Sequence, residues 1–452
     1  MNPPPIDANN LHRLLKLIMV AKAMALPDAT AFLAGLSVNL VCTDEIRESQ
    51  VLQAALLTAV NCANRSYLGG VHVAMPSGIK NLLPLHQADT LNELVELYGG
   101  RPGASPVAPQ TLSFGNTGGG IRVVCDGWRG GIVPEGCQLD FKPAAGGVLG
   151  GIFAGALAVG RCFLADSTVS VDALDSVVGV SLWRPDMEWS DPSAAGPVIA
   201  MLPQKIWLLG LGHLGQAYAW VVSFLPFSDP AAFTLFLQDD DIVIPANQSA
   251  GLLCDQTSVG KLKTRLSSQW LEDRGFSTRI IERKFGLPFR IEEGEPRIAM
   301  CGFDNPEGRR ILEKVGFDVV LECGLGGDVH TFDRIITHTF PQFSETAEEI
   351  WKAEGRKPEF DLDAAQFGVV APEDCGAMVD EIMGISISTA FVGACAAALL
   401  WAELIRAIHD APALERYSLR LRSKLAAKFH VSSDSLQLKV ARNGCLHARQ
   451  PT

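Results

Sequence analysis

The sequence lacks several features that mark common protein classes. None of its 11 cysteines form a C-x-x-C pair, which argues against a zinc ribbon, and their odd number fits a reducing cytoplasm better than a secreted disulfide framework. Basic residues are outnumbered, 38 against 50 acidic residues, and the net charge of -12 argues against nucleic acid as the main partner. The N-terminus lacks the basic and apolar segments of a signal peptide, so we expect a cytoplasmic protein.

Long, strongly apolar runs are also scarce. Two stretches, 144–160 and 382–402, approach the length of a membrane span, which needs about 20 apolar residues. Both are rich in Gly, Ala and Ser, which suits helices packed closely against other elements. The sequence therefore predicts buried core helices and no membrane partner.

The length of 452 residues predicts at least two domains. Short apolar runs alternate with helical patterns in both halves, which is typical of α/β units with parallel sheets. A polar, proline-bearing stretch at 183–197 places the boundary near 190. We therefore expect domains at 1–190 and 191–410, followed by a solvated basic appendage at 411–452, with a docking surface for an acidic partner as the alternative for this last segment.

A glycine-rich turn in the second half is the first functional signal. An expected strand at 205–209 leads into Gly210, Gly212 and Gly215, which form a G-x-G-x-x-G turn suited to phosphates at a helix N-terminus. The next expected strand ends in Asp239, where a carboxylate can bind ribose hydroxyls. This arrangement predicts a nucleotide-binding site.

The residues that follow make the signal more specific. The run from Asp239 to Asn247 has the pattern D-x-D-x-V-x-x-x-N, Lys263 lies sixteen residues later, and Asp304-Asn305 precedes Arg309 by four residues. Together these motifs resemble the ubiquitin-activating (E1-like) superfamily, with ThiF and MoeB. The resemblance covers 204 to about 330 firmly and 370–407 loosely.

The resemblance implies ATP-dependent adenylation of a C-terminal carboxylate, with ATP and Mg²⁺ at one site. Lys263 would stabilise charge at the α-phosphate, and Asp304 would act in catalysis as the Mg²⁺ ligand. The expected nucleotide-binding residues are Gly210, Gly212, Gly215, Asp239, Asp241, Asn247, Lys263 and Asn305.

One departure from the family pattern concerns a cation. The family carries an arginine and a glutamine where this chain has Ala250 and Gly251. In E1-like dimers an arginine near the N-terminus of the partner half reaches the ATP site. By that resemblance Arg13 is the candidate catalytic arginine, with an exposed helix charge as the alternative.

The first half lacks the glycine turn, the aspartate pair and the lysine, but its segment 146–165 looks like the closing helix of an adenylation domain. Some E1-like proteins join an inactive adenylation domain to an active one. We therefore expect an α/β fold with two Rossmann-like adenylation domains arranged as a pseudo-dimer, the first of them degenerate.

A thioester step is expected at Cys375. It lies at the end of a polar stretch, 339–375, where the family's crossover loop carries its catalytic cysteine. A cysteine in such a loop is accessible, which favours reaction of its thiolate, whereas the adjacent Glu373 and Asp374 would raise the pKa of the thiol and disfavour it. The apolar settings of three other thiols predict buried packing residues: Cys301, Cys323 and Cys395.

The resulting hypothesis is an enzyme that activates a small ubiquitin-like protein and passes it to an E2-like carrier in a bacterial, antiphage conjugation pathway. A homodimer is left open. Alternatives are a sulfur-carrier adenylase, which the missing C-x-x-C pairs disfavour, a peptide-modifying adenylase, and a nucleotide-binding scaffold without turnover. A dehydrogenase would leave Lys263 and Asp304-Asn305 unexplained.

Overall fold

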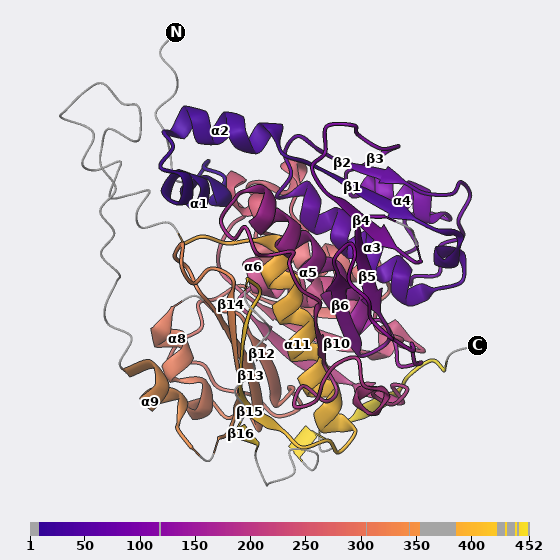
Figure 1. The fold of residues 1–452 in the computed structure, drawn as a ribbon. Helices are drawn as coiled ribbons and strands as arrows, with labels where there is room; N and C mark the ends of the chain where they lie inside the picture. The colour runs from indigo at the N-terminus through magenta and orange to yellow at the C-terminus, as the bar shows by residue number, and fades with distance from the viewer. Residues whose placement is uncertain are drawn as a thin grey trace, which may run out of the picture.

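Two β-sheets, one in each half of the chain, flank a central group of helices (Figure 1). The computed structural model describes residues 9–116, 119–303, 305–342, 344–352, 386–422, 430–431, 439–440 and 443–450. The architecture is α/β, with two Rossmann-like sheets dominated by parallel pairing, as the sequence predicts.

The first sheet has the strand order β3-β2-β1-β4-β5-β6-β7. Its first five strands are parallel, and β6 and β7 continue the sheet in antiparallel pairing. The strands are β1 (Ser37–Cys42), β2 (Gly70–Ala74), β3 (Gly100–Pro102), β4 (Thr111–Phe114), β5 (Ile121–Cys125), β6 (Arg129–Val133) and β7 (Val178–Ser181).

Helices connect the strands of the first half. Ser49 caps the N-terminus of α3 by accepting the Leu52 amide at 3.2 Å, and Thr90 with Glu93 forms a capping box at α4. The elements are α1 (Arg13–Lys22), α2 (Leu26–Gly35), η1 (Asp44–Arg47), α3 (Gln50–Asn64), α4 (Leu91–Leu97) and α5 (Leu149–Asp166), followed by η2 (Pro192–Ala194) in the connection to the second half.

The second sheet has the order β11-β10-β9-β12-β13-β14-β15-β16. Its strands are β9 (Lys205–Leu209), β10 (Thr234–Gln238), β11 (Ser277–Ile281), β12 (Ile298–Cys301), β13 (Val319–Leu325), β14 (Arg334–Phe340), β15 (Leu414–Arg420) and β16 (His430–Val431). A separate ribbon pairs β8 (Met201–Pro203) with β17 (Cys445–His447).

Helices also alternate with the strands of the second half. They are α6 (His213–Val222), η3 (Pro230–Ala232), η4 (Pro245–Ser249), η5 (Gln256–Ser258), α7 (Lys263–Glu272), α8 (Pro306–Arg310), η6 (Leu312–Lys314), α9 (Ala347–Lys352) and α11 (Ala390–Ile408). In each sheet the first strand leads to a helix beside the centre, α3 or α6, and the sixth strand is followed by a long apolar helix, α5 or α11.

The helices α5 and α11 lie side by side between the sheets (Figure 1). Phe163 of α5 packs on Phe391 of α11 with ring centroids 5.9 Å apart, and a Cβ at Gly155 would collide with the Ala55 carbonyl of α3. Both helices are long and apolar enough to cross a membrane, yet 89% and 94% of their apolar windows are buried within the protein. The prediction of buried core helices is confirmed.

The segment after α11 differs from the expected appendage. Leu414–Arg420 forms β15, which pairs with β14 and buries every second residue, including Tyr417 and Leu419. The prediction of a solvated appendage is wrong for this segment, because its alternating residues are buried and the strand joins the second sheet between β14 and β16. Within the expected loop 339–375, Ala347–Lys352 forms α9, and residues 353–375 lie outside the described part.

Candidate functional site

A cavity of about 1360 Å³ opens at the carboxyl ends of β9, β10 and β12. In doubly wound sheets this edge is where ligands bind, at the point where the strand order reverses. The cavity extends across the same face to β14 and β15. Its lining contains most of the residues that the sequence motifs single out.

The glycine turn forms the floor of the cavity. Gly210 has a φ of +78°, which favours glycine, and no atom would lie within 4 Å of a Cβ at Gly212. Both residues line the cavity, and the N-terminus of α6 begins directly after Gly212. Gly215 is not among the lining residues, because it packs against the Gly210 carbonyl and holds the helix close to the turn.

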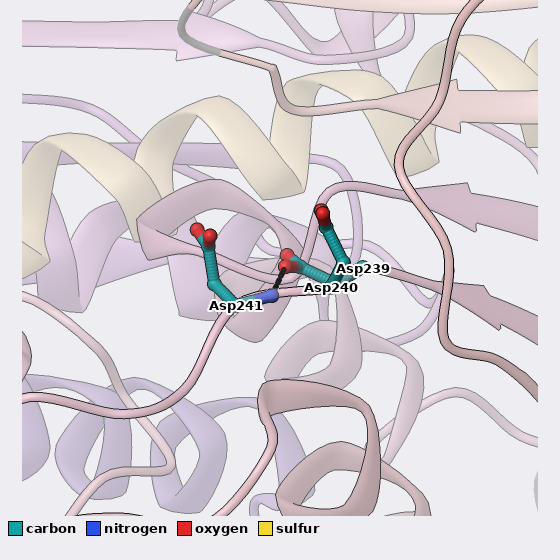
Figure 2. A group of neighbouring side chains, drawn as sticks. All are labelled: Asp239, Asp240 and Asp241. Atoms are coloured by element: carbon teal, nitrogen blue, oxygen red, sulfur yellow. Dashed lines mark hydrogen bonds between the residues drawn. The ribbon is translucent and has the colours of Figure 1, made fainter.

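Asp239 lies at the end of β10 and organises the turn. Its carboxylate accepts the Leu211 amide at 2.5 Å and the Asp241 amide at 2.8 Å. Figure 2 shows the side chains of Asp239, Asp240 and Asp241 projecting from one short segment. Burial raises the pKa of the Asp239 carboxyl, and the nearby Lys263 ammonium opposes that rise.

Lys263 begins α7 and faces the same segment. Its ammonium contacts the Asp241 carboxylate at 2.6 Å, and its amide donates to the Asp241 carbonyl at 3.0 Å. The lysine side chain is 11% exposed and the aspartate 67%. The cation is therefore fixed at the cavity wall, with its partner turned toward solvent.

Two predicted asparagines line the cavity and also cap short helices. Asn247 accepts the Ile244 amide at 2.9 Å, and Asn305 accepts the Gly308 amide at 2.7 Å at the start of α8. Their carbonyl oxygens are therefore engaged, which leaves their amide N–H groups as donors toward a ligand.

The first half of the chain contributes to the cavity through its N-terminal segment. Arg13 lines the cavity; its amide donates to the Ser249 hydroxyl at 3.2 Å, and the Asn9 carbonyl accepts the Ala246 amide at 2.8 Å. These bonds attach the start of α1 to η4. The structure thus places Arg13 at the cavity that the glycine turn borders.

Ala250 and Gly251, where the family has an arginine and a glutamine, also line the cavity. A different arginine supports this loop from behind. Arg65, buried at the end of α3, donates to the carbonyls of Gly251 at 2.8 Å and Cys254 at 3.0 Å. Arg65 is not among the lining residues, so it holds the loop without reaching the cavity.

A buried charged cluster in the wall was not predicted from the sequence. Glu322 of β13 contacts the Arg309 guanidinium at 3.0 Å and Nδ1 of His338 at 2.9 Å, and all three line the cavity. In the sequence, Arg309 stands out only as the last residue of the motif that begins at Asp304. Lys284 and Phe285 are further lining residues without a sequence signal, and Phe285 packs on Phe303 with centroids 4.9 Å apart.

Asp304 and Cys375, two expected catalytic residues, lie outside the described residues. Of the ten cysteines in the described part, eight are buried and two, Cys137 and Cys445, are partly exposed. Cys301, Cys323 and Cys395 are fully buried, as expected, and burial raises the pKa of each thiol.

The described residues fit a nucleotide with a divalent cation. The open turn at Gly212, the N-terminus of α6 and the cation of Lys263 suit phosphate groups. The carboxylates of Asp239, Asp240 and Asp241 offer oxygen atoms within 4.8 Å of one another. Mg²⁺ prefers one or two such carboxylates together with phosphate oxygens.

Comparisons with known proteins match both halves of the chain. The profile of the BilD N-terminal domain matches residues 37–182, and that of the BilD C-terminal domain matches residues 202–411. The bacterial E1-like protein BilD of Collimonas sp. (strain OK412) is 34% identical over 422 residues, which cover 91% of each chain.

Two solved structures align over about half of this chain. Escherichia coli MccB is 18% identical with a TM-score of 0.33, and the alignment covers 51% of this chain and 62% of MccB. PaaA is 18% identical with a TM-score of 0.34, and the alignment covers 50% and 64%. In both cases the alignment spans less than two thirds of the other chain.

Proposed function

Because the chain belongs to the BilD family of bacterial E1-like proteins, we propose that it uses ATP to activate the C-terminal carboxylate of a small ubiquitin-like protein. The observation that carries this proposal is the single cavity that Gly210, Gly212, Asp239 and Lys263 share with Arg13 from the other half. A phosphate-binding turn, a carboxylate for ribose and two cations are what adenylation requires.

In the proposed reaction, a carboxylate oxygen of the substrate attacks the α-phosphorus of ATP, and the bond to the β-phosphate breaks. Pyrophosphate leaves and an acyl-adenylate forms. The turn at Gly210 and Gly212 holds the phosphates, Asp239 binds the ribose, and Lys263 stabilises the charge that builds at the α-phosphate. Asn247 and Asn305 donate to the nucleotide through their amide groups.

Two further groups complete the proposed site. Arg13 stabilises the triphosphate in place of the cation that is missing at Ala250 and Gly251. Asp304 is proposed as the Mg²⁺ ligand, with Asp239 and Asp241 as neighbouring oxygen donors. Bound Mg²⁺ would neutralise phosphate charge during the attack.

The proposal continues with transfer of the activated protein. The Cys375 thiolate attacks the acyl carbon, AMP leaves and a thioester forms. An E2-like carrier then takes the protein, in a cytoplasmic bacterial conjugation pathway with an antiphage role. The described cysteines support this choice, since eight of the ten are buried and Cys375 is the one that falls in the expected crossover loop.

The adenylation step is tested by ATP–pyrophosphate exchange with candidate ubiquitin-like proteins. We expect exchange with the intact chain, and its loss in Lys263→Ala and in Asp304→Ala. Lys261→Ala is the matched control, because this residue is not among those that line the cavity. Exchange that survives both site substitutions within a few-fold would overturn the assigned roles, and tighter binding of NAD than of ATP would overturn adenylation itself.

The transfer step is tested by intact-mass spectrometry after incubation with ATP and the protein substrate. A reducible adduct is expected on the wild type, a stable oxyester or no adduct on Cys375→Ser, and unchanged pyrophosphate exchange without an adduct for Cys375→Ala. An adduct at Cys254 would move the thioester site. Exchange without any adduct would favour a sulfur-carrier or peptide adenylase, and ATP binding without exchange would favour a scaffold.

A further inference from the structure

Two arginines line the part of the cavity that is farthest from the glycine turn. Arg334 of β14 and Arg416 of β15 are half-buried, and neither guanidinium has a hydrogen-bond or ion-pair partner within the described residues. Neighbouring arginines are engaged: Arg420 lies 3.6 Å and Arg422 2.9 Å from the buried carboxylate of Asp333. The two cations are therefore available to an anionic ligand.

The phosphates of ATP do not account for these two cations. The strand order β9-β12-β13-β14-β15 places β14 three strands and β15 four strands from the glycine turn. Strands lie about 4.8 Å apart, so these distances are roughly 14 Å and 19 Å. A triphosphate bound at Gly210 and Gly212 would not reach either guanidinium group, so both can bind a different part of the substrate.

The register shows how a second ligand would lie. Glu322, His338 and Arg416 are paired in one row across β13, β14 and β15. Arg334 lies on the same face of β14 as His338, four residues away, with Ile336 between them. Arg416 is thus about 10 Å from Glu322 across the sheet, and Arg334 about 13 Å from His338 along β14.

Two acidic residues, Glu345 and Glu349, also line the cavity, and the carboxylate of Glu349 is hydrogen-bonded. Glu349 of α9 accepts the Thr346 amide at 2.9 Å and hydroxyl at 2.8 Å. The two cations thus come from β14 and β15, whereas these two carboxylates come from α9 and the segment before it, so an acidic ligand would lie against the strands.

We propose that this cationic surface, formed by Arg334, Ile336 and Arg416, binds an acidic C-terminal tail of the protein substrate in extended conformation. This inference rests on the proposed function, since the tail must bring its terminal carboxylate to the ATP site. Guanidinium groups pair with carboxylates through two parallel hydrogen bonds. An extended chain advances about 3.3 Å per residue, which places the acidic side chains roughly three to seven residues before the terminal carboxylate.

Charge complementarity supports this occupant. The chain as a whole has a net charge of -12, so an acidic segment needs a local cationic surface in order to bind. Within the described part of the chain, the guanidinium groups of Arg334 and Arg416 have no partner, and they supply such a surface inside the cavity. They also select against neutral tails, which would leave both guanidinium groups desolvated without a partner.

The test uses two fluorescent twelve-residue peptides that end in glycine and differ only at positions three to seven from the C-terminus, with aspartates in one and asparagines in the other. Binding to the full chain is measured by fluorescence anisotropy with a non-hydrolysable ATP analogue present. We expect the aspartate peptide to bind at least about tenfold more tightly, with a preference that weakens as salt rises.

Variants assign that preference to the two arginines. Arg334→Gln with Arg416→Gln should abolish it while the affinity for the ATP analogue and the melting temperature stay unchanged. The control Arg122→Gln with Arg279→Gln also removes two positive charges, but neither residue lines the cavity. This double variant should retain the preference for the aspartate peptide. Arg334→Lys with Arg416→Lys should retain part of it, because the charge remains and the paired hydrogen bonds are lost.

Equal binding of both peptides, no binding of either at millimolar concentration, or a preference that survives the double glutamine variant would each overturn the inference. Failure of the proposed function has a different signature: the peptide preference would persist, but no ubiquitin-like protein would support pyrophosphate exchange. Exchange that ignores tail charge would overturn the tail inference alone.

Discussion

Arg13 belongs to the first half of the chain but borders the cavity of the second. Since Ala250 and Gly251 supply no charge there, we expect Arg13→Ala to lower the rate of pyrophosphate exchange by about 10²-fold, the effect of removing one donor to a developing charge. The affinity for ATP should change much less. Arg47→Ala, at an exposed position bonded to Asp44, is the control and should exchange normally.

A second residue-scale prediction concerns pH. His213 lines the cavity at the start of α6, and burial lowers its pKa to about 4. The unfolded chain binds a proton near pH 6.5 whereas the folded protein does not, so stability is full above pH 6.5 and falls as the pH drops toward 4.

The melting temperature of the wild type should therefore fall between pH 6.5 and pH 4. In His213→Gln this fall should be smaller but not absent, because burial also lowers the pKa of His12 to about 4. His86 is exposed, so His86→Gln should show the same fall in melting temperature between pH 6.5 and pH 4 as the wild type. If the melting temperature fell equally in the wild type and in His213→Gln, this histidine would not contribute to the pH dependence of stability.

The sequence identified those cavity-lining residues that belong to local motifs. Gly210, Gly212 and Lys263 line the cavity because their positions are set by one turn or one helix start. Glu322 and His338 were missed because they meet only through the antiparallel pairing of β13 with β14. That register depends on a connection between distant segments, and no local pattern specifies it.

At the scale of elements, the parallel core was predictable and the antiparallel edge was not. The mainly apolar runs of the sequence at 35–42, 121–125 and 205–209 coincide with the strands β1, β5 and β9, each of which has a parallel neighbour. By contrast, β6 contains Gly130 and Gly131, which a sequence pattern indicates as turn residues. A Cβ at Gly130 would collide with the Gly150 carbonyl, so tight packing on α5 explains the glycine in this strand.

The close approach of α5 and α3 leads to a prediction about stability. An alanine in a helix normally stabilises it by about 1 kcal/mol relative to glycine. At Gly155, however, the added methyl group would collide with the Ala55 carbonyl oxygen, a backbone atom that cannot move aside independently. Gly155→Ala should therefore lower the free energy of unfolding by about 1–3 kcal/mol, measured by urea denaturation.

Gly35→Ala provides the matched control for this substitution. Gly35 ends α2, is exposed, and has no atom within 4 Å of its Cβ position. Its replacement should leave stability unchanged or raise it slightly. Equal effects at the two positions would contradict the view that α5 and α3 pack backbone to backbone.

At the scale of the whole molecule, the two sheets share one plan. Both have the strand order third, second, first, fourth, fifth, sixth, seventh, with the first five strands parallel and the next two antiparallel. The helices α3 and α5 correspond to α6 and α11, and these four form the layer between the sheets. The sequence indicated only that both halves alternate strands with helices and end in a small-residue helix. It did not show the shared strand order, because the two halves have no residue-level repeat.

The shared plan raises the question of whether the first half has its own nucleotide site, and we expect that it does not. Where the second half has its glycine turn after β9, the first half has Thr43, Asp44 and Glu45 after β1. The Glu45 carboxylate accepts the Asn116 amide at 3.2 Å and its side-chain N–H at 3.0 Å, and a Cβ at Gly115 would collide with the Thr43 hydroxyl. Side chains occupy this edge of the first sheet, and its carboxylates repel phosphate.

Calorimetric titration with a non-hydrolysable ATP analogue and Mg²⁺ should therefore give one site per chain. Lys263→Ala should weaken that site, because it removes the cation beside Asp241. Glu45→Gln, which removes a carboxylate from the corresponding edge of the first sheet, should leave both the affinity and the stoichiometry unchanged. Two sites per chain, or a site that responds to Glu45 rather than Lys263, would place nucleotide binding in the first half and contradict the division of roles between the halves.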